Sequence, residues 1–389
     1  MPQAASRGWS IDRCRVEFVD AGACPDLSAE WSGLEATADG SPFTSWAWVS
    51  TWLKHLPAAV RPVLCRIRDG QGLVALGMLV RAPERGLRKA FGSHSIRLQE
   101  TGDEVIDEIT PEYVGLLVRS GREIAAYTAF FEAISQRCRG WRRIQVPATG
   151  HGSEIQAALP DGLRAYSVCE RPAYTVDMAA VRASGRRYVD HLPKKTRANL
   201  SQVRRAYAAH GPLRVDIAAT PQLALEWLGA LRQLHEQRWE AKGGAGSFAS
   251  PYFRAFHGEL VASGVTSGLV ELIRVTAGDL VVGYLFVLQW RGRRYYYSSG
   301  FNYGALPRYD SPGIAALHAV IEHGSDAGWE LFDFLGGSQD YKRRLSTGSQ
   351  RLHWIDVRRA GPLLAAEALV WRMLAGKTLG SPLEQAHAS

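Results

Sequence analysis

Residues 298–320, SSGFNYGALPRYDSPGIAALHAV, join the end of a predicted strand to the start of a predicted helix. Ser311 is a preferred N-cap residue and Pro312 suits the first helical turn, so the helix is expected to begin there. Gly313 lets a ligand approach the free N–H groups of that turn, where the helix dipole favours phosphate. Arg308 is a candidate phosphate partner. The alternative is an ordinary capped helix, which is a common local pattern.

The segments around this loop predict a mixed α/β fold. Helical periodicity covers residues 188–211 and 221–243, with the first helix ending at Gly211. Residues 268–300 read as three strands joined by turns, residues 311–329 as a helix and residues 330–335 as a strand. Strands that alternate with helices in this way indicate an α/β class with a mixed (α+β) sheet.

A similar order occurs in the first half of the chain. An apolar stripe of Trp48, Trp52 and Leu56 predicts a helix that starts at Ser41, or at Thr44 or Ser45. A hairpin is expected around Asp69-Gly70, followed by a helix over 124–134 and a strand over 141–148. The hairpins at 69–80 and 277–288 resemble each other loosely, which suggests a distant internal duplication.

Length and pattern divide the chain into three predicted parts. The 389 residues suffice for two domains, and the boundary is expected near residues 169–178. We therefore predict a first domain over 1–172, a second over 173–360, and a helix with a polar tail over 361–389.

Composition predicts a cytoplasmic protein without a metal. No apolar run is long enough for a membrane span, and the N-terminus lacks the apolar core of a signal peptide. The cysteines are odd in number and scattered, which favours reduced thiols and argues against a zinc site. The net charge of +8 favours an anionic ligand or partner, although the arginine content also fits a bias of genome composition.

Residues 332–344, FDFLGGSQDYKRR, place Asp333 between two phenylalanines in a predicted strand. A buried carboxylate is costly unless it is paired. On one interpretation Asp333 is a general base, or the partner of one, with a raised pKa. On the other it pairs with a nearby cation such as Lys342 and fixes the loop.

Other candidates carry weaker signals. Tyr341 is placed to protonate a departing thiolate, or merely to pack with its hydroxyl at the surface. Lys342 is a candidate for binding phosphate or the acceptor, the alternative being a solvated lysine, and His318 is expected to be a packing residue rather than a base. The basic helix face of Lys194, Arg197, Arg204 and Arg205 either meets an anionic substrate or is simply solvated. No hydrolase elbow, Walker loop or H-E-x-x-H motif is present.

These segments, together with GSFASPYFRAF at 246–256 and SPFTSWAWVSTW at 41–52, resemble the acetyltransferase domain of the CelD/BcsL type. That group is associated with cellulose biosynthesis and belongs to the GNAT-like superfamily, close to the Fem aminoacyl transferases. The resemblance extends from about residue 40 to residue 358, and its most specific pieces are the Ser-Pro-Gly helix start and the Asp-Phe and Tyr-Lys ending.

The resemblance implies two tandem GNAT-like domains in a Fem-like arrangement. It implies that the loop from Arg308 to Gly313, with Ser311, holds the pyrophosphate of acetyl-CoA or another acyl-CoA. The strand from Tyr295 to Ser299, which includes Tyr297 and Ser298, would run beside the pantetheine arm. Gly336 and Ser338 depart from the arginine and the acid that the family commonly has there.

Three functions follow as hypotheses. The first is an acyl-CoA-dependent N-acyltransferase that acts directly on a small or polysaccharide-related acceptor, with Asp333 and Tyr341 as catalytic candidates. The second is a Fem-like transferase that takes an aminoacyl group from tRNA, the one case in which a nucleic acid partner is expected. The third is a non-catalytic partner in exopolysaccharide biosynthesis.

Overall fold

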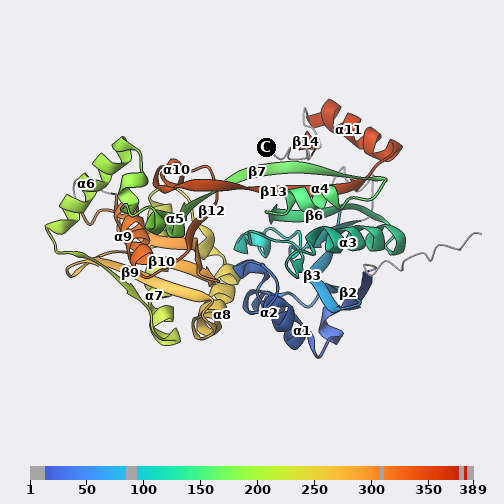
Figure 1. Ribbon diagram of the computed structural model, residues 1–389, viewed down its shortest axis with the longest axis horizontal. Coiled ribbons are helices and arrows are strands. Elements are labelled where there is room, and N and C mark those ends of the chain that lie inside the picture. Colours follow the sequence, from blue (N-terminus) through green and yellow to red (C-terminus); the bar gives the residue numbers. More distant parts are fainter. Residues whose placement is uncertain (1–13, 85–93, 307–310, 376–380, 383–389) are drawn as a thin grey trace, which may run out of the picture.

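One continuous mixed sheet forms the backbone of the molecule (Figure 1). The computed structural model describes residues 14–84, 94–306, 311–375 and 381–382. Over these residues the sheet has 14 strands, in the path β1-β2-β3-β4-β6-β13-β7-β12-β11-β10-β9-β8, with β5 and β14 beside it. Helices cover both faces, which confirms the mixed α/β class.

The first half of the chain supplies one end of the sheet and four α-helices. Its strands are β1 (Arg15–Asp20), β2 (Val63–Asp69), β3 (Gly72–Pro83), β4 (His94–Leu98), β5 (Leu117–Val118) and β6 (Trp141–Thr149). Its helices are α1 (Leu27–Glu35), α2 (Trp46–His55), α3 (Glu123–Arg137) and α4 (Gly152–Ala157). The predicted hairpin at Asp69-Gly70 is confirmed, because β2 pairs antiparallel with β3.

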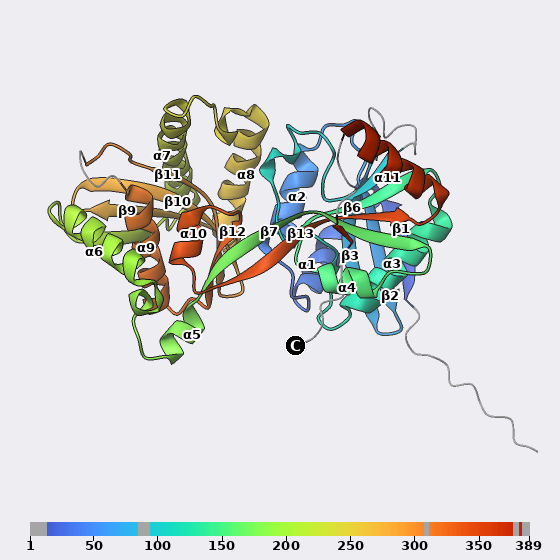
Figure 2. The same cartoon turned by 90° about the horizontal axis from the view of Figure 1, so that it is seen from above.

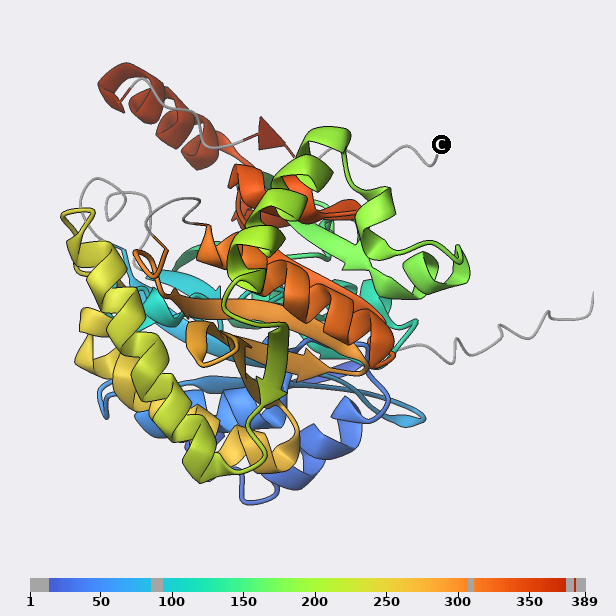
Figure 3. The ribbon, with the colours of Figure 1, turned by 90° about the vertical axis from the view of Figure 1, so that its left-hand side faces the viewer.

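The rest of the chain, from Leu163 onward, supplies the other end of the sheet and the two strands, β7 and β13, that join its ends. Its strands are β7 (Leu163–Asp177), β8 (Leu213–Ile217), β9 (Val270–Ala277), β10 (Leu280–Trp290), β11 (Arg293–Phe301), β12 (Leu331–Gly336), β13 (Gly348–Arg359) and β14 (Ser381–Pro382). Its helices are α5 (Met178–Ala183), α6 (Lys194–Ala208), α7 (Pro221–Glu240), α8 (Pro251–Ser267), α9 (Pro312–Asp326), α10 (Asp340–Leu345) and α11 (Pro362–Ala375). Figure 3 shows α6 and α9 on one side of the strands and α7 and α8 on the other.

The two halves repeat one order of strands. In the first half, β1 to β4 pair antiparallel in sequence, α3 crosses over, and β6 then pairs parallel with β4. In the second half, β8 to β11 pair antiparallel, α9 crosses over, and β12 pairs parallel with β11. This repeated order is the arrangement that an internal duplication predicts.

Each half is completed by a strand from the opposite side of the chain. β13, near the C-terminal end of the chain, pairs antiparallel with β6 of the first half, whereas β7, which follows β6, pairs with β12 of the second half. β7 and β13 also pair with each other along their length, from Gly348 opposite Thr175 to Arg359 opposite Leu163. Figure 2 shows these two strands crossing together between the halves. Neither half therefore has a complete sheet made of one stretch of chain.

The predicted boundary near residues 169–178 falls inside β7, which runs unbroken from Leu163 to Asp177. The chain thus passes from one half to the other as a paired strand, not as an exposed linker. The division into residues 1–172, 173–360 and 361–389 stays a prediction.

A shared core also joins the halves. The predicted tryptophan stripe lies on α2, whose N-cap is Ser45, and Trp48 and Trp52 are fully buried. Trp48 packs edge-on against Phe256 of α8, with ring centroids 5.0 Å apart. Leu56 lies just beyond the helix as its C-cap residue. The apolar face of α2 therefore packs on a helix of the second half, which helical periodicity alone does not specify.

The exchange of strands predicts that the halves unfold together. Ile355 on β13 is 1% exposed, and its truncation in Ile355→Ala is expected to cost about 2–5 kcal/mol of unfolding free energy through lost packing and a cavity. Hydrogen exchange followed by mass spectrometry should show faster exchange in both β4 and β12. The control is Leu369→Ala on α11, where the side chain is 56% exposed and little change is expected. Loss of protection confined to the first half would contradict the coupling.

Candidate functional site

The site forms where two parallel strands separate. β11 and β12 are paired from Arg293 opposite Leu331 to Tyr295 opposite Asp333, and their pairing ends there. Beyond this point the register of β12 on β7 shifts between Asp333 and Gly336, and Leu335 has a positive φ of 60°. A non-glycine residue in this conformation is uncommon and costs about 1 kcal/mol or more, so the surrounding contacts must hold it.

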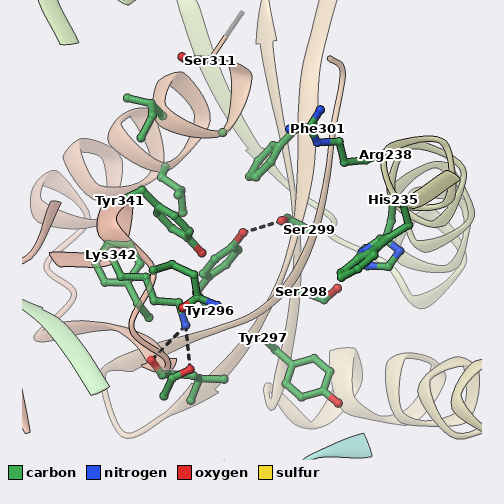
Figure 4. Close-up of a pocket in the computed structure, with 18 of the residues that line it drawn as sticks. His235, Arg238, Tyr296, Tyr297, Ser298, Ser299, Phe301, Ser311, Tyr341 and Lys342 are labelled. Atoms are coloured by element: carbon green, nitrogen blue, oxygen red, sulfur yellow. Dashed lines mark hydrogen bonds between the residues drawn. The ribbon is translucent and has the colours of Figure 1, made fainter. Parts of the chain in front are cut away.

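A cavity of about 530 Å³ occupies the gap between the separated strands (Figure 4). This volume lies in the range of small-molecule sites. Side chains from β11, β12, α7, α9 and α10 line it, together with Thr110 and Glu112 from the first half of the chain. Six of the residues proposed from the sequence line it: Tyr297, Ser298, Ser311, Gly313, Tyr341 and Lys342.

The first turn of α9 stands at one end of the cavity. Ser311 is its N-cap residue and Pro312 its first residue, as predicted, and the side chain of Ser311 makes no capping hydrogen bond. Gly313 lies against Phe301, and a Cβ at this position would come within 3.0 Å of the phenylalanine ring. Glycine therefore keeps the helix start close to the end of β11. Arg308, the predicted phosphate partner, lies outside the described residues.

The strand β11 carries a bulge beside the cavity. Opposite β10, Ser298 pairs with Phe286 and Tyr296 with Val287, so Tyr297 is the extra residue. A bulge leaves its extra residue outside the regular ladder and re-aims the groups around it. The hydroxyl of Tyr297 donates to the carbonyl of Ile109 at 2.6 Å, which joins the bulge to the first half of the chain.

Asp333 is fully buried and lies behind the cavity, not among the described residues that line it. Its Oδ2 accepts a hydrogen bond of 2.5 Å from the hydroxyl of Tyr113, and one of 3.3 Å from Nε2 of Gln350. Its Oδ1 accepts from the amide of Leu335 at 2.7 Å. Burial raises the pKa of Asp333 to about 6, and these hydrogen bonds oppose that rise. The carboxyl therefore fixes the bend of β12 and ties it to the first half.

Lys342 does not form a direct ion pair with Asp333. Its Nζ donates instead to the carbonyls of Leu335 and Gly336, at 3.2 and 3.0 Å. The side chain is buried, and burial lowers its pKa while Glu112 and Asp333 oppose that shift. Lys342 thus holds the carbonyls that the bend exposes and places a positive charge at the cavity wall.

Glu112 is the carboxylate that faces the cavity, and it was not among the predicted site residues. Its Oε2 accepts a hydrogen bond of 2.6 Å from the amide of Gly336. Burial raises its pKa to about 7, although the Gly336 amide and the charge of Lys342 oppose the rise. A carboxyl with a pKa near neutrality is suited to accept a proton at physiological pH.

Gly336 makes this approach possible. A Cβ at residue 336 would stand 3.1 Å from Oε1 and 3.3 Å from Oε2 of Glu112. The carboxylate therefore occupies the space that a side chain at position 336 would need. This gives a physical reason for glycine at position 336.

Tyr341 lies on α10 and lines the cavity with its ring edge-on to Phe334, the two centroids 6.4 Å apart. Burial raises the pKa of Tyr341 to about 12, and a hydrogen bond with Tyr296 opposes that rise. The phenol is thus protonated at neutral pH, and it is a hydrogen-bond donor rather than a strong acid.

The C-terminal end of α7 supplies side chains that the sequence reading missed: His235, Arg238 and Trp239, with Lys242 just beyond. The guanidinium of Arg238 stacks on Tyr303, 3.9 Å from the ring centroid. Nε of Arg238 is buried and has no hydrogen-bond partner among the described residues. Figure 4 shows Arg238 on the same side as Phe301, toward the end of the cavity where Ser311 lies. A cationic donor therefore lines the same cavity as the helix start.

Comparison with known proteins identifies the part of the chain that holds this site. Residues 194–343 match the family described as acetyltransferase (GNAT) domain. This match covers α6 to α10, including both strands that separate around the cavity. This part of the chain is therefore similar to a GNAT-type acetyltransferase domain. No curated protein matches the chain.

Solved structures with a similar fold span nearly the whole chain. The structure titled "Crystal structure of FemX" has a TM-score of 0.56 at 9% identity and covers 90% of this chain and 98% of its own. A tandem GNAT protein from the clavulanic acid biosynthesis pathway has a TM-score of 0.44 at 15% identity, covering 90% and 99%. The FemX likeness concerns the fold, which is two tandem GNAT-like halves in a Fem-like arrangement.

Two further features bear on the sequence predictions. Within the described ranges, no helix combines the length and apolar character needed to cross a bilayer. Across the same ranges, His, Cys, Asp and Glu side chains form no group of three or more that is arranged to hold a metal ion.

The tie between Asp333 and Tyr113 can be tested by removing one hydroxyl. Tyr113→Phe is expected to cost about 1–3 kcal/mol of unfolding free energy, because a buried carboxylate loses a hydrogen bond. Denaturant unfolding at pH 8 measures this change. The control is Tyr166→Phe, whose hydroxyl has no hydrogen-bond partner among the described residues. Equal effects of the two substitutions would contradict an anchoring role for the Tyr113 hydroxyl.

The raised pKa of Glu112 predicts a dependence of stability on pH. Because the pKa in the folded state, about 7, exceeds the ordinary value of 4.5, the folded protein favours the protonated carboxyl. The resulting stabilisation is present below pH 4.5 and is lost as the pH rises through 7. Glu112→Gln removes this titration. Between pH 5 and pH 8, the unfolding free energy of the variant is therefore expected to rise by about 2 kcal/mol relative to that of the native protein.

Unfolding free energies of both proteins at pH 5 and pH 8 measure that difference. The control is Glu104→Gln, at an exposed position, which should shift stability equally at the two pH values. A Glu112→Gln variant whose stability relative to the native protein is the same at both pH values would contradict the raised pKa.

Proposed function

We propose that this protein is an acyl-CoA-dependent N-acyltransferase, acetyl-CoA being the first donor to test. The observation that carries the proposal is the cavity between the separated ends of β11 and β12, inside the segment that matches a GNAT domain. A GNAT domain implies an acyl-CoA co-substrate. The acyl group would pass directly to an amine of the acceptor, without a covalent enzyme intermediate.

The residues around the cavity suit a phosphate-bearing donor with a narrow arm. The uncapped first turn of α9, at Ser311 and Gly313, offers backbone N–H groups to a pyrophosphate. Arg238, whose Nε has no hydrogen-bond partner among the described residues, supplies a charged donor in the same cavity. Tyr297 and Ser298 on β11 then border the arm, and Lys342 lies at the far wall. These assignments follow the sequence prediction, with Arg238 added.

The proposed reaction forms one C–N bond and breaks one C–S bond. The amine nitrogen attacks the thioester carbonyl carbon, and the sulfur leaves as a thiolate. Glu112 takes the proton that the amine loses, because its carboxylate lines the cavity and its pKa of about 7 matches that task. The bulge at Tyr297 is the candidate source of a backbone N–H for the negative charge that develops on the carbonyl oxygen.

Tyr341 is proposed to stabilise the leaving thiolate by donating a hydrogen bond. With a pKa of about 12, it is a weaker acid than a thiol of ordinary pKa near 8.5, so complete proton transfer from Tyr341 is unfavourable. The proton held by Glu112 remains available to neutralise the thiolate before the products leave.

For Asp333 the contacts favour a positioning role over that of a general base. It fixes Leu335 and Tyr113 from behind the cavity, and both of its carboxylate oxygens already accept hydrogen bonds. The base assignment passes to Glu112, which follows Pro111 and precedes Tyr113 in the chain. Asp333 would then affect catalysis through the shape of β12.

The acceptor is proposed to be small or polysaccharide-related. Two other hypotheses remain as outcomes of the tests: transfer of an aminoacyl group from tRNA, and a non-catalytic role in exopolysaccharide biosynthesis. Activity that RNase abolishes would favour the first, and stable partners without any affinity for acyl-CoA would favour the second.

Binding and turnover separate these roles. Isothermal titration with acetyl-CoA, and release of free thiol with a panel of amines, should both be positive for the native protein. Arg238→Ala is expected to weaken acetyl-CoA binding roughly tenfold or more, because a charge-assisted hydrogen bond is lost. Glu112→Gln should leave binding nearly unchanged and reduce kcat by about 10² to 10⁴.

The matched control for binding is Arg61→Ala, at an exposed position in the first half. A larger loss of kcat in Asp333→Asn than in Glu112→Gln, at equal stability, would return the role of base to Asp333. A native protein that neither binds acetyl-CoA nor releases thiol with any amine would contradict the proposed function.

A further inference from the structure

The positive charge of this protein is concentrated in one short segment. Residues 182–210 contain eight Lys or Arg residues and one acidic residue, so their formal net charge is +7, against +8 for the whole chain. The other residues together are therefore nearly neutral. A composition bias of the genome would spread arginine along the whole chain. It therefore does not account for a net positive charge that is concentrated in residues 182–210.

The charged side chains of this segment point outward. The residues Arg182, Arg186, Arg187, Lys194, Lys195, Arg197, Arg204 and Arg205, here called the basic surface, are all exposed. The apolar face of α6, with Leu200, Val203 and Tyr207, is buried in the core that α6 shares with α9. Residues 182–210 contribute none of the large exposed hydrophobic side chains found on the described surface. Figure 1 shows α6 at the end of the molecule away from the first half.

A groove of about 560 Å³ runs through the basic surface. Four arginines line the groove: Arg187 from the segment before α6, and Arg197, Arg204 and Arg205 from α6 itself. Asp190 and Ser201 also line it. Two of the arginines have an ion-pair partner: Nε of Arg187 is 3.6 Å from Oδ2 of Asp190, and Nη1 of Arg204 is 3.9 Å from Oε1 of Glu322. The side chains of Lys194, Lys195 and Arg205 make no hydrogen bond or ion pair with another described residue. Most of the positive charge is thus not neutralised within the described protein.

We infer that the groove binds a single-stranded phosphodiester chain through its charged backbone. The paired N–H groups of an arginine guanidinium match the geometry of phosphate oxygens. A groove whose charged lining is mostly positive concentrates the electrostatic attraction on a narrow anionic polymer that can enter it. A planar lipid surface cannot enter a groove, and residues 182–210 have no large exposed apolar side chain to insert into a bilayer. The segment also has no exposed Phe, Tyr or Trp ring for base stacking, so binding is expected to be independent of base sequence.

The test uses the full-length protein and a fluorescein-labelled oligo(dT) of 20 nucleotides, with fluorescence anisotropy measured across a salt series. With four arginines on phosphates, the slope of log K against log salt is expected to be about −3. Arg187→Glu/Arg205→Glu should weaken binding at least about tenfold at low salt and reduce the slope by about 1.4. Circular dichroism and thermal unfolding should match those of the native protein.

The matched control is Arg61→Glu/Arg139→Glu, two exposed positions in the first half that change the net charge equally. It is expected to bind the oligonucleotide like the native protein. Equal weakening by both double variants would assign binding to overall charge and overturn the groove. Binding to vesicles of phosphatidylglycerol without binding to oligo(dT) would overturn the phosphodiester ligand in favour of a membrane surface, and absence of both would overturn the proposal.

Discussion

The paired strands β7 and β13 are the constraint on which the rest of this structure depends. Each completes the sheet of one half while lying beside the strand that completes the other. The backbone N–H and C=O groups of a strand in the interior of a sheet need hydrogen-bond partners on both sides. The two halves therefore cannot separate without exposing a long unpaired strand edge. This interlock fixes the two halves in one relative position, and the shared core around Trp48 and Phe256 reinforces it.

The site uses that fixed position directly. Its cavity opens where β11 and β12 lose their pairing, but the groups that shape it come from both halves. Tyr113 and Glu112 are adjacent in the first half, and they contact Asp333 and Gly336 in the second. One of these contacts anchors the bent strand and the other places a carboxyl of raised pKa in the cavity. A small shift between the halves would disturb both at once.

The charge distribution separates two surfaces of the second half. The first turn of α9 lies at the cavity. The apolar side chains of α9 also pack against α6 in a shared core, and the outward face of α6 carries the basic groove. The proposed phosphate-bearing donor and the proposed polymeric anion would therefore meet different faces of the segment that matches a GNAT domain. Since residues outside 182–210 are almost neutral in sum, long-range attraction of anions arises mainly at the α6 end.

The sequence by itself determined the elements and much of one wall of the site. Periodicity and turn residues placed the Asp69-Gly70 hairpin, and the Ser-Pro-Gly start placed α9, because these signals act between residues close in the chain. The residue patterns and the resemblance together pointed to six residues that line the cavity. Only the tertiary structure decided that β7 and β13 are exchanged, that Asp333 is held by Tyr113 and Gln350 instead of Lys342, and that Glu112 faces the cavity. Asp333 and Tyr113 are 220 positions apart in the chain, and Gly336 and Glu112 are 224 apart. Strand order and burial bring such pairs together, and the local sequence pattern does not. No short motif could therefore predict these contacts.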